Sequence, residues 1–199
     1  MVKPLYIEPR NVDLKMPLVT NARLGNPFLV DETSPKQHHK AVYEIARFMS
    51  KECKYDMIYY TQMVLFRNFE PEQDCRSFLW VHPESHGVSN EYRIPCIGAA
   101  CFRYRRWKNT DPGWAMQWVW MHPYYRGGSS AIDTHNRVKS LLRWSWPTLV
   151  EKFGVFFVEP PLTASMKRFL IKNEYWDHCP GLKESLAEKE TEKESLCTE

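Results

Sequence analysis

The chain has 199 residues, of which 43% are hydrophobic and 26% charged, and its formal net charge is +3. These proportions exclude a wholly disordered or fibrous chain, and 14 Pro beside only 8 Gly exclude a collagen-like composition. No apolar run reaches the roughly 18 residues of a membrane-spanning helix, and the N-terminus lacks the apolar stretch of a secretory signal. We therefore expect a cytoplasmic protein without a membrane partner.

Charge divides the chain into a basic body and an acidic end. Six Glu and three Lys occur from Leu182 onward, a net charge of −3, which leaves +6 on the body. Because this end has no sustained apolar face, we expect a single domain over residues 1–181 and a flexible, dispensable tail over 182–199. A modestly basic body suits an anionic ligand such as a nucleotide cofactor.

The six cysteines form no C-x-x-C pair, and no secretory signal precedes them. A disulfide framework is therefore disfavoured, and buried thiols are the expected state.

The first clear element is a helix that begins at Ser34-Pro35. Ser34 is the expected N-cap, Pro35 fits the first helical position, and Gln37 completes a capping box. Apolar residues then recur on one helical face at Val42, Ile45, Met49 and Cys53. Before this helix, residues 16–30 contain short apolar pieces that suggest a strand and a turn. After it, residues 57–68 are compatible with a helix or a strand.

The middle of the chain predicts strands at Ser77–Val81, Pro95–Trp107 and Trp114–Met121. The turn Asn109–Gly113 joins the last two strands into a hairpin.

The second of these strands carries a basic and aromatic sequence. Alternation places Phe102, Tyr104 and Arg106 on one face, and Arg103, Arg105 and Trp107 on the other. Aromatic rings beside Arg can stack bases and hold phosphates, so Arg103, Arg105 and Arg106 are candidate contacts to nucleic acid. The alternative is a packed face with a solvated basic end.

The C-terminal third predicts a helix, a strand and a second helix. The first helix begins after Gly127-Gly128, kinks or restarts at Pro147 and ends at Gly154. Val155–Val158 reads as a fully buried strand. Pro161–Asn173 reads as a helix whose inward residues are Leu162, Met166, Phe169 and Leu170.

The chemically informative stretch is Trp118–Ala131, in which a strand runs into small residues that open a helix. Small residues let a ligand approach the backbone closely, and the first N–H groups of a helix point at that ligand. With the helix dipole, this arrangement can hold a phosphate, and Arg126 adds a fixed positive charge. A simple strand–turn–helix connection is the alternative.

Val119–Ala131 resembles the acyl-CoA-binding motif of the GNAT superfamily of N-acyltransferases. Trp120–Arg126 fits the V-x-P-x-Y-R approach, and Arg126–Ala131 fits the glycine signature, with Ser129 where the family usually has Gly. The resemblance implies that acetyl-CoA is held by Trp120, Met121, Arg126, Gly127, Gly128, Ser129, Ser130 and Ala131.

A second segment resembles the end of the same family. Val155–Pro160 matches its strand, and Thr163–Tyr175 matches the helix that follows, although Leu170 stands where many members have a Tyr that protonates the departing thiolate. The implied fold is α/β, with a GNAT-like mixed, mostly antiparallel central sheet and flanking helices. The sheet would be splayed between the acyl-CoA-binding strand and the next strand.

The resemblance implies an acyl-CoA-dependent N-acetyltransferase, in which an amine acceptor attacks the thioester of acetyl-CoA directly. Glu159 and His122, each at a strand end, are candidate bases, and Tyr175 and Tyr125 are candidate acids. The alternatives are a strand-end charge in solvent for Glu159, a structural histidine for His122, and core positions for the tyrosines.

Two other functions remain open at this point. One is a nucleic-acid-directed GNAT-fold enzyme that modifies DNA bases or acylates aminoacyl-tRNA, and the other is a non-catalytic GNAT-fold binding protein. No metal site is expected. Adjacent His38 and His39 diverge on a helix, and Pro83 prevents helical pairing of His82 with His86.

Overall fold

The computed structural model describes residues 15–20, 26–54, 75–82, 93–105, 112–126, 141–179 and 182. The predicted segments 57–68 and 127–131, the turn at 109–111 and residues 183–199 lie outside this part of the chain.

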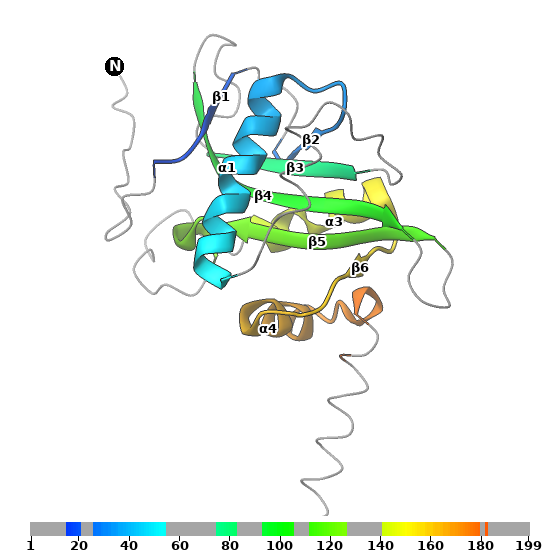
Figure 1. The fold of residues 1–199 in the computed structure, drawn as a ribbon. Helices are drawn as coiled ribbons and strands as arrows, with labels where there is room; N and C mark the ends of the chain where they lie inside the picture. Colours follow the sequence, from blue (N-terminus) through cyan, green and yellow to red (C-terminus); the bar gives the residue numbers. More distant parts are fainter. Residues whose placement is uncertain are drawn as a thin grey trace, which may run out of the picture.

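The described strands form one six-stranded sheet in the order β2-β3-β4-β5-β6, and β1 pairs with β4 (Figure 1). The strands are β1 (Leu18–Val19), β2 (Phe28–Val30), β3 (Cys75–Val81), β4 (Ile94–Arg105), β5 (Gly113–Met121) and β6 (Phe157–Val158). The pair β5–β6 is parallel, and the other pairs are antiparallel. The fold is therefore α/β with a mixed, mostly antiparallel sheet, as the sequence predicts.

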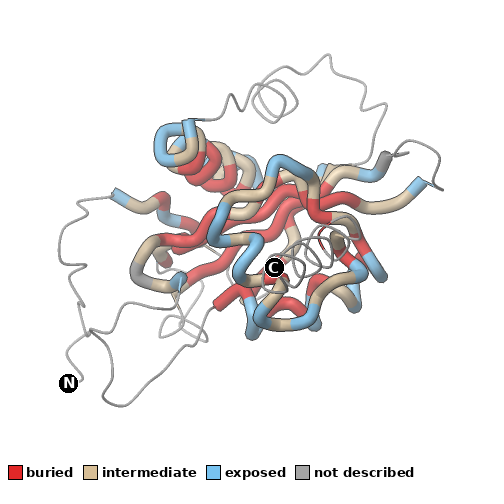
Figure 2. The backbone as a smooth tube through the Cα atoms, turned by 90° about the horizontal axis from the view of Figure 1, so that it is seen from below, coloured by how far each residue is buried: buried red, intermediate tan, exposed pale blue. Residues whose placement is uncertain are grey.

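Helices lie against both faces of this sheet. Helix α1 (Lys36–Cys53) crosses the front face in Figure 1, and α3 (Leu141–Phe153) lies behind it. Helix α4 (Ala164–Lys172) lies beyond the β6 edge, and short 3₁₀ turns occur at η2 (Pro123–Tyr125) and η3 (Trp176–His178). The central strands are buried along most of their length between the two layers (Figure 2). An α1-side core and an α3-side core result.

Helix α1 confirms the predicted apolar face but not the predicted cap. Val42, Ile45 and Met49 are buried against the sheet. The helix begins at Lys36 without a side-chain cap, because Ser34 Oγ accepts a bond from the Asp31 backbone N–H at 3.0 Å. The capping box was therefore a wrong prediction, since the Asp31 turn engages the Ser34 hydroxyl.

Gln37, the other half of that box, is also engaged elsewhere. Its Nε2 donates a hydrogen bond to the hydroxyl oxygen of Thr20, the residue after β1, at 2.6 Å. Both side chains of the predicted capping box thus bond to residues outside the helix. A local sequence pattern cannot show such partners, because they compete with the cap from other segments.

The strand and helix ends in the last third differ in three places from the sequence prediction. Helix α3 continues through Pro147 without restarting, and it ends as predicted before Gly154, whose φ is +67°. Strand β6 comprises only Phe157 and Val158, because Val155 is 63% exposed and Phe156, although buried, lies before the strand. Helix α4 begins at Ala164, where the Thr163 hydroxyl accepts a bond from the Met166 backbone N–H at 3.2 Å.

Leu182, which the sequence analysis assigns to the tail, is the last residue that the structure describes. Leu182 is 8% exposed and belongs to the α3-side core, and its N–H donates to the Cys179 carbonyl at 3.0 Å. A single apolar residue at the start of a polar segment has no periodic signal, so the sequence does not mark Leu182 as buried.

A matched pair of truncations tests the contribution of Leu182. A chain ending at Gly181 loses the buried Leu182 side chain, at a cost of about 2–5 kcal/mol, so its melting temperature is expected to fall by at least about 4 °C. A chain ending at Ala187 keeps Leu182 and is expected to melt like the full chain. Differential scanning calorimetry on both chains measures the difference, and equal melting temperatures would show that Leu182 contributes nothing.

Gly98 permits the close approach of β4 to the end of β5. A Cβ at this position would lie 2.3 Å from Met121 Sδ and 3.0 Å from the Trp120 carbonyl oxygen. The thioether can move, but the backbone carbonyl cannot, so Gly98→Ala is expected to destabilise the fold by about 1–3 kcal/mol. Gly113→Ala is the control, since its nearest contact would be 4.0 Å away. Urea unfolding of both variants checks the difference.

His178, in η3, bonds through its two ring nitrogens to α3 and to Phe156, the residue before β6. Trp146 Nε1 donates to His178 Nε2 at 3.3 Å, so Nε2 carries no proton and Nδ1 donates to the Phe156 carbonyl at 2.7 Å. Burial lowers the pKa of His178, because the buried neutral ring is favoured over the imidazolium.

The stability of the fold is therefore expected to fall in mild acid. Below the unfolded pKa of about 6.5, the unfolded chain binds a proton that native His178 does not, so stability is lost as the pH falls toward the folded pKa. Burial lowers the pKa of His39 and His122 in the same direction. Urea unfolding between pH 7.5 and 5.5 should show this loss, and His178→Asn should make it shallower. If stability falls with pH as steeply in His178→Asn as in the unaltered protein, His178 is not the source of this pH dependence.

Candidate functional site

The sheet opens between β5 and β6. Pairing is limited to Ala115 with Phe157 and Met116 with Val158, and one further bond runs from the Glu159 N–H to the Met116 carbonyl at 3.0 Å. The next residues, Pro160 and Pro161, have no N–H with which to extend a ladder. Strand β5 therefore continues to Met121 with no described strand on that side.

A β-bulge lies at the point where the sheet opens. Strand β4 pairs Cys101 with Trp118 and Phe102 with Met116, so Gln117 is an extra residue in β5. The bulge reverses the side-chain alternation, because Met116 belongs to the α3-side core whereas Trp118 belongs to the α1-side core. Bulges re-aim groups and end pairing, and they are over-represented next to active sites.

Beyond the bulge, β5 presents backbone groups to the open side. The His122 N–H donates to the Ile97 carbonyl of β4 at 2.7 Å. Since backbone groups alternate along a strand, Val119 and Met121 direct their N–H and C=O groups away from β4. The Met121 carbonyl accordingly accepts a bond from Arg126 Nε at 2.7 Å.

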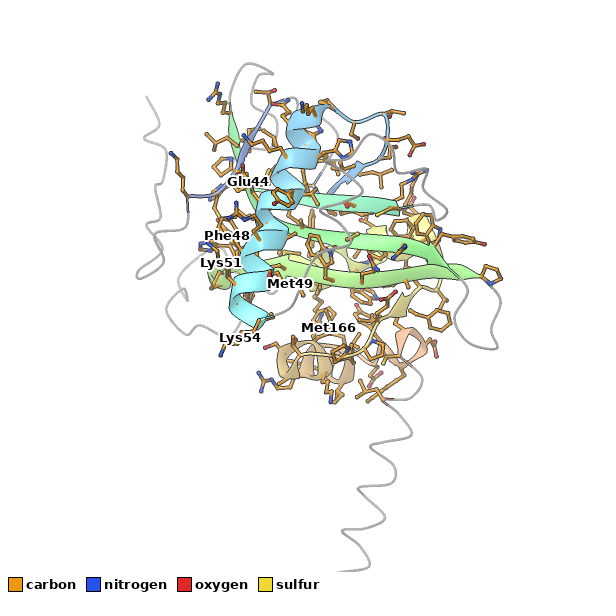
Figure 3. The ribbon with its side chains drawn as sticks, in the orientation of Figure 1. Glu44, Phe48, Met49, Lys51, Lys54 and Met166 are labelled. Carbon is orange, nitrogen blue, oxygen red and sulfur yellow. The ribbon has the colours of Figure 1, made fainter. Side chains whose placement is uncertain are left out.

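Two methionines flank this open edge. Met49 lies on the β5 side of α1, and Met166 extends from α4 toward β5 (Figure 3). Met49 is buried with Trp118 in the α1-side core, and Met166 packs against the α3-side core. An extended ligand along β5 would thus lie between adaptable apolar side chains from two helices.

Glu159, the predicted base, lies where the opening starts. Its backbone N–H donates to the carbonyl of Met116, the residue directly before the bulge. The residue as a whole is half-buried, but one of its carboxylate oxygens, Oε1, is buried. The alternative of a strand-end charge in solvent therefore does not describe this side chain.

His122, the second predicted base, lies at the other end of the open edge. It is six residues beyond Met116, which corresponds to about 20 Å of strand. The His122 side chain is buried, and both burial and the charge of Arg126 lower its pKa, so the ring is neutral at pH 7. The rings of Trp120 and Tyr125 lie 6.3 and 6.1 Å from it. The structure therefore does not bring His122 together with Glu159.

Tyr175, the predicted acid, packs in the α3-side core. Its ring stacks on Trp146 with centroids 4.8 Å apart and planes inclined by 4°. The rings of Phe169 and His178 also lie near it, with centroids 5.8 and 6.1 Å from that of Tyr175. Leu170 is fully buried. These contacts match the alternative of a core role for Tyr175.

Arg126 is held by a carboxylate that the sequence analysis missed. Its two terminal nitrogens bond to the two oxygens of Glu52, in the last turn of α1, the second at 2.6 Å. Glu52 also accepts a bond from Trp120 Nε1 at 2.7 Å, and the guanidinium lies over the Trp120 ring at 5.2 Å from its centroid. The Arg126 guanidinium holds the pKa of Glu52 below its usual value. We call this group, Glu52, Trp120 and Arg126, the clamp.

No local signal could have revealed Glu52, because 74 residues separate it from Arg126 and it reads as one more charge on the polar face of a helix. The clamp ties the end of α1 to the end of β5, directly before the glycine turn. Lys51 and Lys54 project from the same end of α1 (Figure 3). These two lysines therefore add positive charge at the end of α1 that the clamp ties to β5.

Several predicted residues cannot be placed. The cofactor residues Gly127, Gly128, Ser129, Ser130 and Ala131 lie outside the described residues, as do Arg106 and the side chain of Arg105. Arg103 is half-buried on β4, and Tyr104 is 41% exposed with its ring 5.5 Å from that of Trp114. Tyr104 thus offers one exposed ring beside a basic strand.

In the part of the chain that the structure describes, His, Cys, Asp and Glu side chains form no group of three that could hold a metal ion. Its helices include none that is both long enough and apolar enough to cross a bilayer. Comparison with protein-family models and with curated proteins finds no match to this chain. The functional assignment therefore depends on the two sequence motifs and on the geometry of β5.

Proposed function

We propose that this protein is an acyl-CoA-dependent N-acyltransferase that binds its thioester along the open edge of β5. One observation carries the proposal. Strand β5 loses its β6 neighbour at a bulge and then runs with an open edge into Arg126 and the glycine turn. This order of features agrees with the GNAT resemblance of the sequence.

The chemistry of acyl-CoA suits such an edge. Its pantetheine arm carries two secondary amides, which can pair with an open strand as an added strand would. The backbone groups of Val119 and Met121 face the side on which the arm would lie. The diphosphate would then reach the end of β5, where Arg126, Lys51 and Lys54 supply positive charge.

The reaction at the bulge would be direct acyl transfer. Glu159 takes a proton from the acceptor ammonium, and the free amine attacks the thioester carbon. Backbone N–H groups at the bulge hold the carbonyl oxygen as it gains negative charge. The carbon–sulfur bond then breaks and CoA leaves as a thiolate, while the attacking nitrogen gives its second proton to solvent. Solvent also protonates the thiolate, because Leu170 offers no proton.

The structure also bears on the two alternatives. A nucleic acid as the acceptor is favoured only by the exposed ring of Tyr104 beside Arg103. A binding protein without catalysis is favoured by Leu170 and by the core position of Tyr175. Binding of acetyl-CoA without release of CoA thiol in the presence of amines would support the second alternative.

The test uses Val119→Pro with Val119→Ala as its matched control. Proline removes the N–H that faces the open side and leaves the β4 ladder its bonds. We expect calorimetry to show that Val119→Pro weakens binding of CoA about tenfold, the worth of one or two hydrogen bonds. Binding of 3′-phosphoadenosine diphosphate, which lacks the pantetheine arm, should not change, and this also shows that the variant is folded. If Val119→Pro weakens the binding of both ligands equally, or leaves CoA binding unchanged, the pantetheine arm does not lie along β5.

A further inference from the structure

We propose that Cys75 and Cys101 form a dithiol site that hydrogen peroxide converts to a reversible disulfide. Cys75 is the first residue of β3, Cys101 lies in β4, and their Sγ atoms are 3.5 Å apart. Both side chains are on the α1 side of the sheet, Cys101 within the core and Cys75 packed against it. This site is independent of the proposed transfer reaction.

The strand register brings the two side chains into contact, and a cross-link requires the backbone at one of them to shift. Cys75 pairs with Arg103 and Cys101 with Ser77, so the two cysteines are diagonal neighbours on adjacent strands. A disulfide bond is about 2.05 Å long, so the sulfur atoms must approach by about 1.5 Å. Cys75 is at a strand end, where the backbone can shift without breaking a ladder on both sides.

The surroundings of the two thiols give them different roles. The contact with Cys75 and burial raise the pKa of the Cys101 thiol, so Cys101 is the harder of the two thiols to deprotonate. Cys75 is half-buried and so is open to a small oxidant, whereas Cys101 is fully buried. Arg103 lies close enough to favour negative charge at the pair. Cys75 is therefore the first thiol to react.

The reaction balances in two steps. The Cys75 thiolate attacks one peroxide oxygen, the O–O bond breaks, and the leaving hydroxide takes up a proton, which yields a sulfenic acid and water. Cys101 Sγ then attacks the Cys75 sulfur, the S–O bond breaks, and the hydroxide leaves as water with the Cys101 proton. Two thiols are oxidised by two electrons in all, and one hydrogen peroxide is reduced to two waters.

The pair also contacts the bulge of β5. The Cys101 thiol lies 3.8 Å from the side-chain oxygen of Gln117, the extra residue of the bulge. A cross-link between β3 and β4 would therefore be formed directly beside the opening of the sheet.

The experiment treats the folded, full-length protein with equimolar hydrogen peroxide, blocks remaining thiols and maps peptides by mass spectrometry without reduction. We expect a Cys75–Cys101 peptide pair with the loss of two hydrogen atoms, and its disappearance after dithiothreitol. Cys75→Ser should abolish the pair, and Cys96→Ala, which removes another buried thiol, should not. In Cys101→Ala, dimedone should trap a sulfenic acid on Cys75. A Cys75 that is oxidised to sulfinic acid without a cross-link, that pairs with another cysteine or that stays unmodified would overturn the proposal.

Discussion

Replacement of Glu159 by Gln is expected to lower the rate constant of acetyl transfer by about 10²- to 10⁴-fold, the range that a positioned general base contributes. Glu159 lies at the first open position of the sheet, with one carboxylate oxygen buried. Gln preserves the size of the side chain but cannot take a proton from the acceptor ammonium. Binding of acetyl-CoA and the melting temperature should change little. The measurement is release of CoA thiol under single-turnover conditions.

Glu151→Gln is the matched control for this variant. Glu151 is an exposed carboxylate on α3 and is expected to have no effect on transfer. A Glu159→Gln protein that transfers at the normal rate at every pH would assign the base to another residue. Burial and the charge of Arg126 lower the pKa of His122, which favours the neutral ring that can accept a proton, so His122→Gln would be the next variant to measure.

Arg126→Glu is expected to weaken acetyl-CoA binding by about 2–4 kcal/mol, which corresponds to about 30- to 900-fold in the dissociation constant. Three of the five N–H groups of the guanidinium bond to Met121 and Glu52, so two remain for a diphosphate. A carboxylate at this position would repel the ligand. Isothermal titration of acetyl-CoA measures the loss.

Arg126→Glu also changes the clamp, because it places a second carboxylate against Glu52. A loss of affinity in this variant could therefore come from a disturbed clamp as well as from a lost contact with the cofactor. The charge-swapped protein, with Glu52→Arg and Arg126→Glu together, separates the two effects. We expect the swap to restore the melting temperature by renewing the ion pair, while acetyl-CoA binding stays weak. If the swap restores affinity as well, Arg126 acts only by holding α1 against β5 and makes no contact with the cofactor.

The clamp also connects two parts of the proposed site. It joins the last turn of α1 to the residues that lead into the glycine turn. Because Glu52 is 43% exposed and Arg126 35%, solvent and salt screen the pair, and its contribution to stability is at the lower end for ion pairs. Its main effect is on position, because it holds the guanidinium over the Trp120 ring.

The sequence by itself determined the local elements whose signals lie within a few residues. The apolar spacing of α1, the β4–β5 hairpin and the glycine that ends α3 were all predicted, because helix periodicity, strand composition and a positive φ at Gly154 are properties of short segments. The position of Glu159 at a strand end followed from the two prolines after it.

The tertiary structure decided the features that depend on neighbouring strands. The bulge at Gln117 exists only in register with β4, and it reverses which side of the sheet Trp118 faces. The sequence offers no sign of it, because the alternation within a single strand cannot reveal an extra residue relative to its partner.

Side-chain partners likewise depended on contacts between segments that are distant in the chain. Arg126 bonds to Glu52, and Gln37 bonds to Thr20 instead of capping its own helix. Tyr175, predicted as an acid, stacks on Trp146 because α4 returns its C-terminal end to the α3-side core. A polar or aromatic side chain takes the partner that packing brings within reach, and packing is decided by the whole chain.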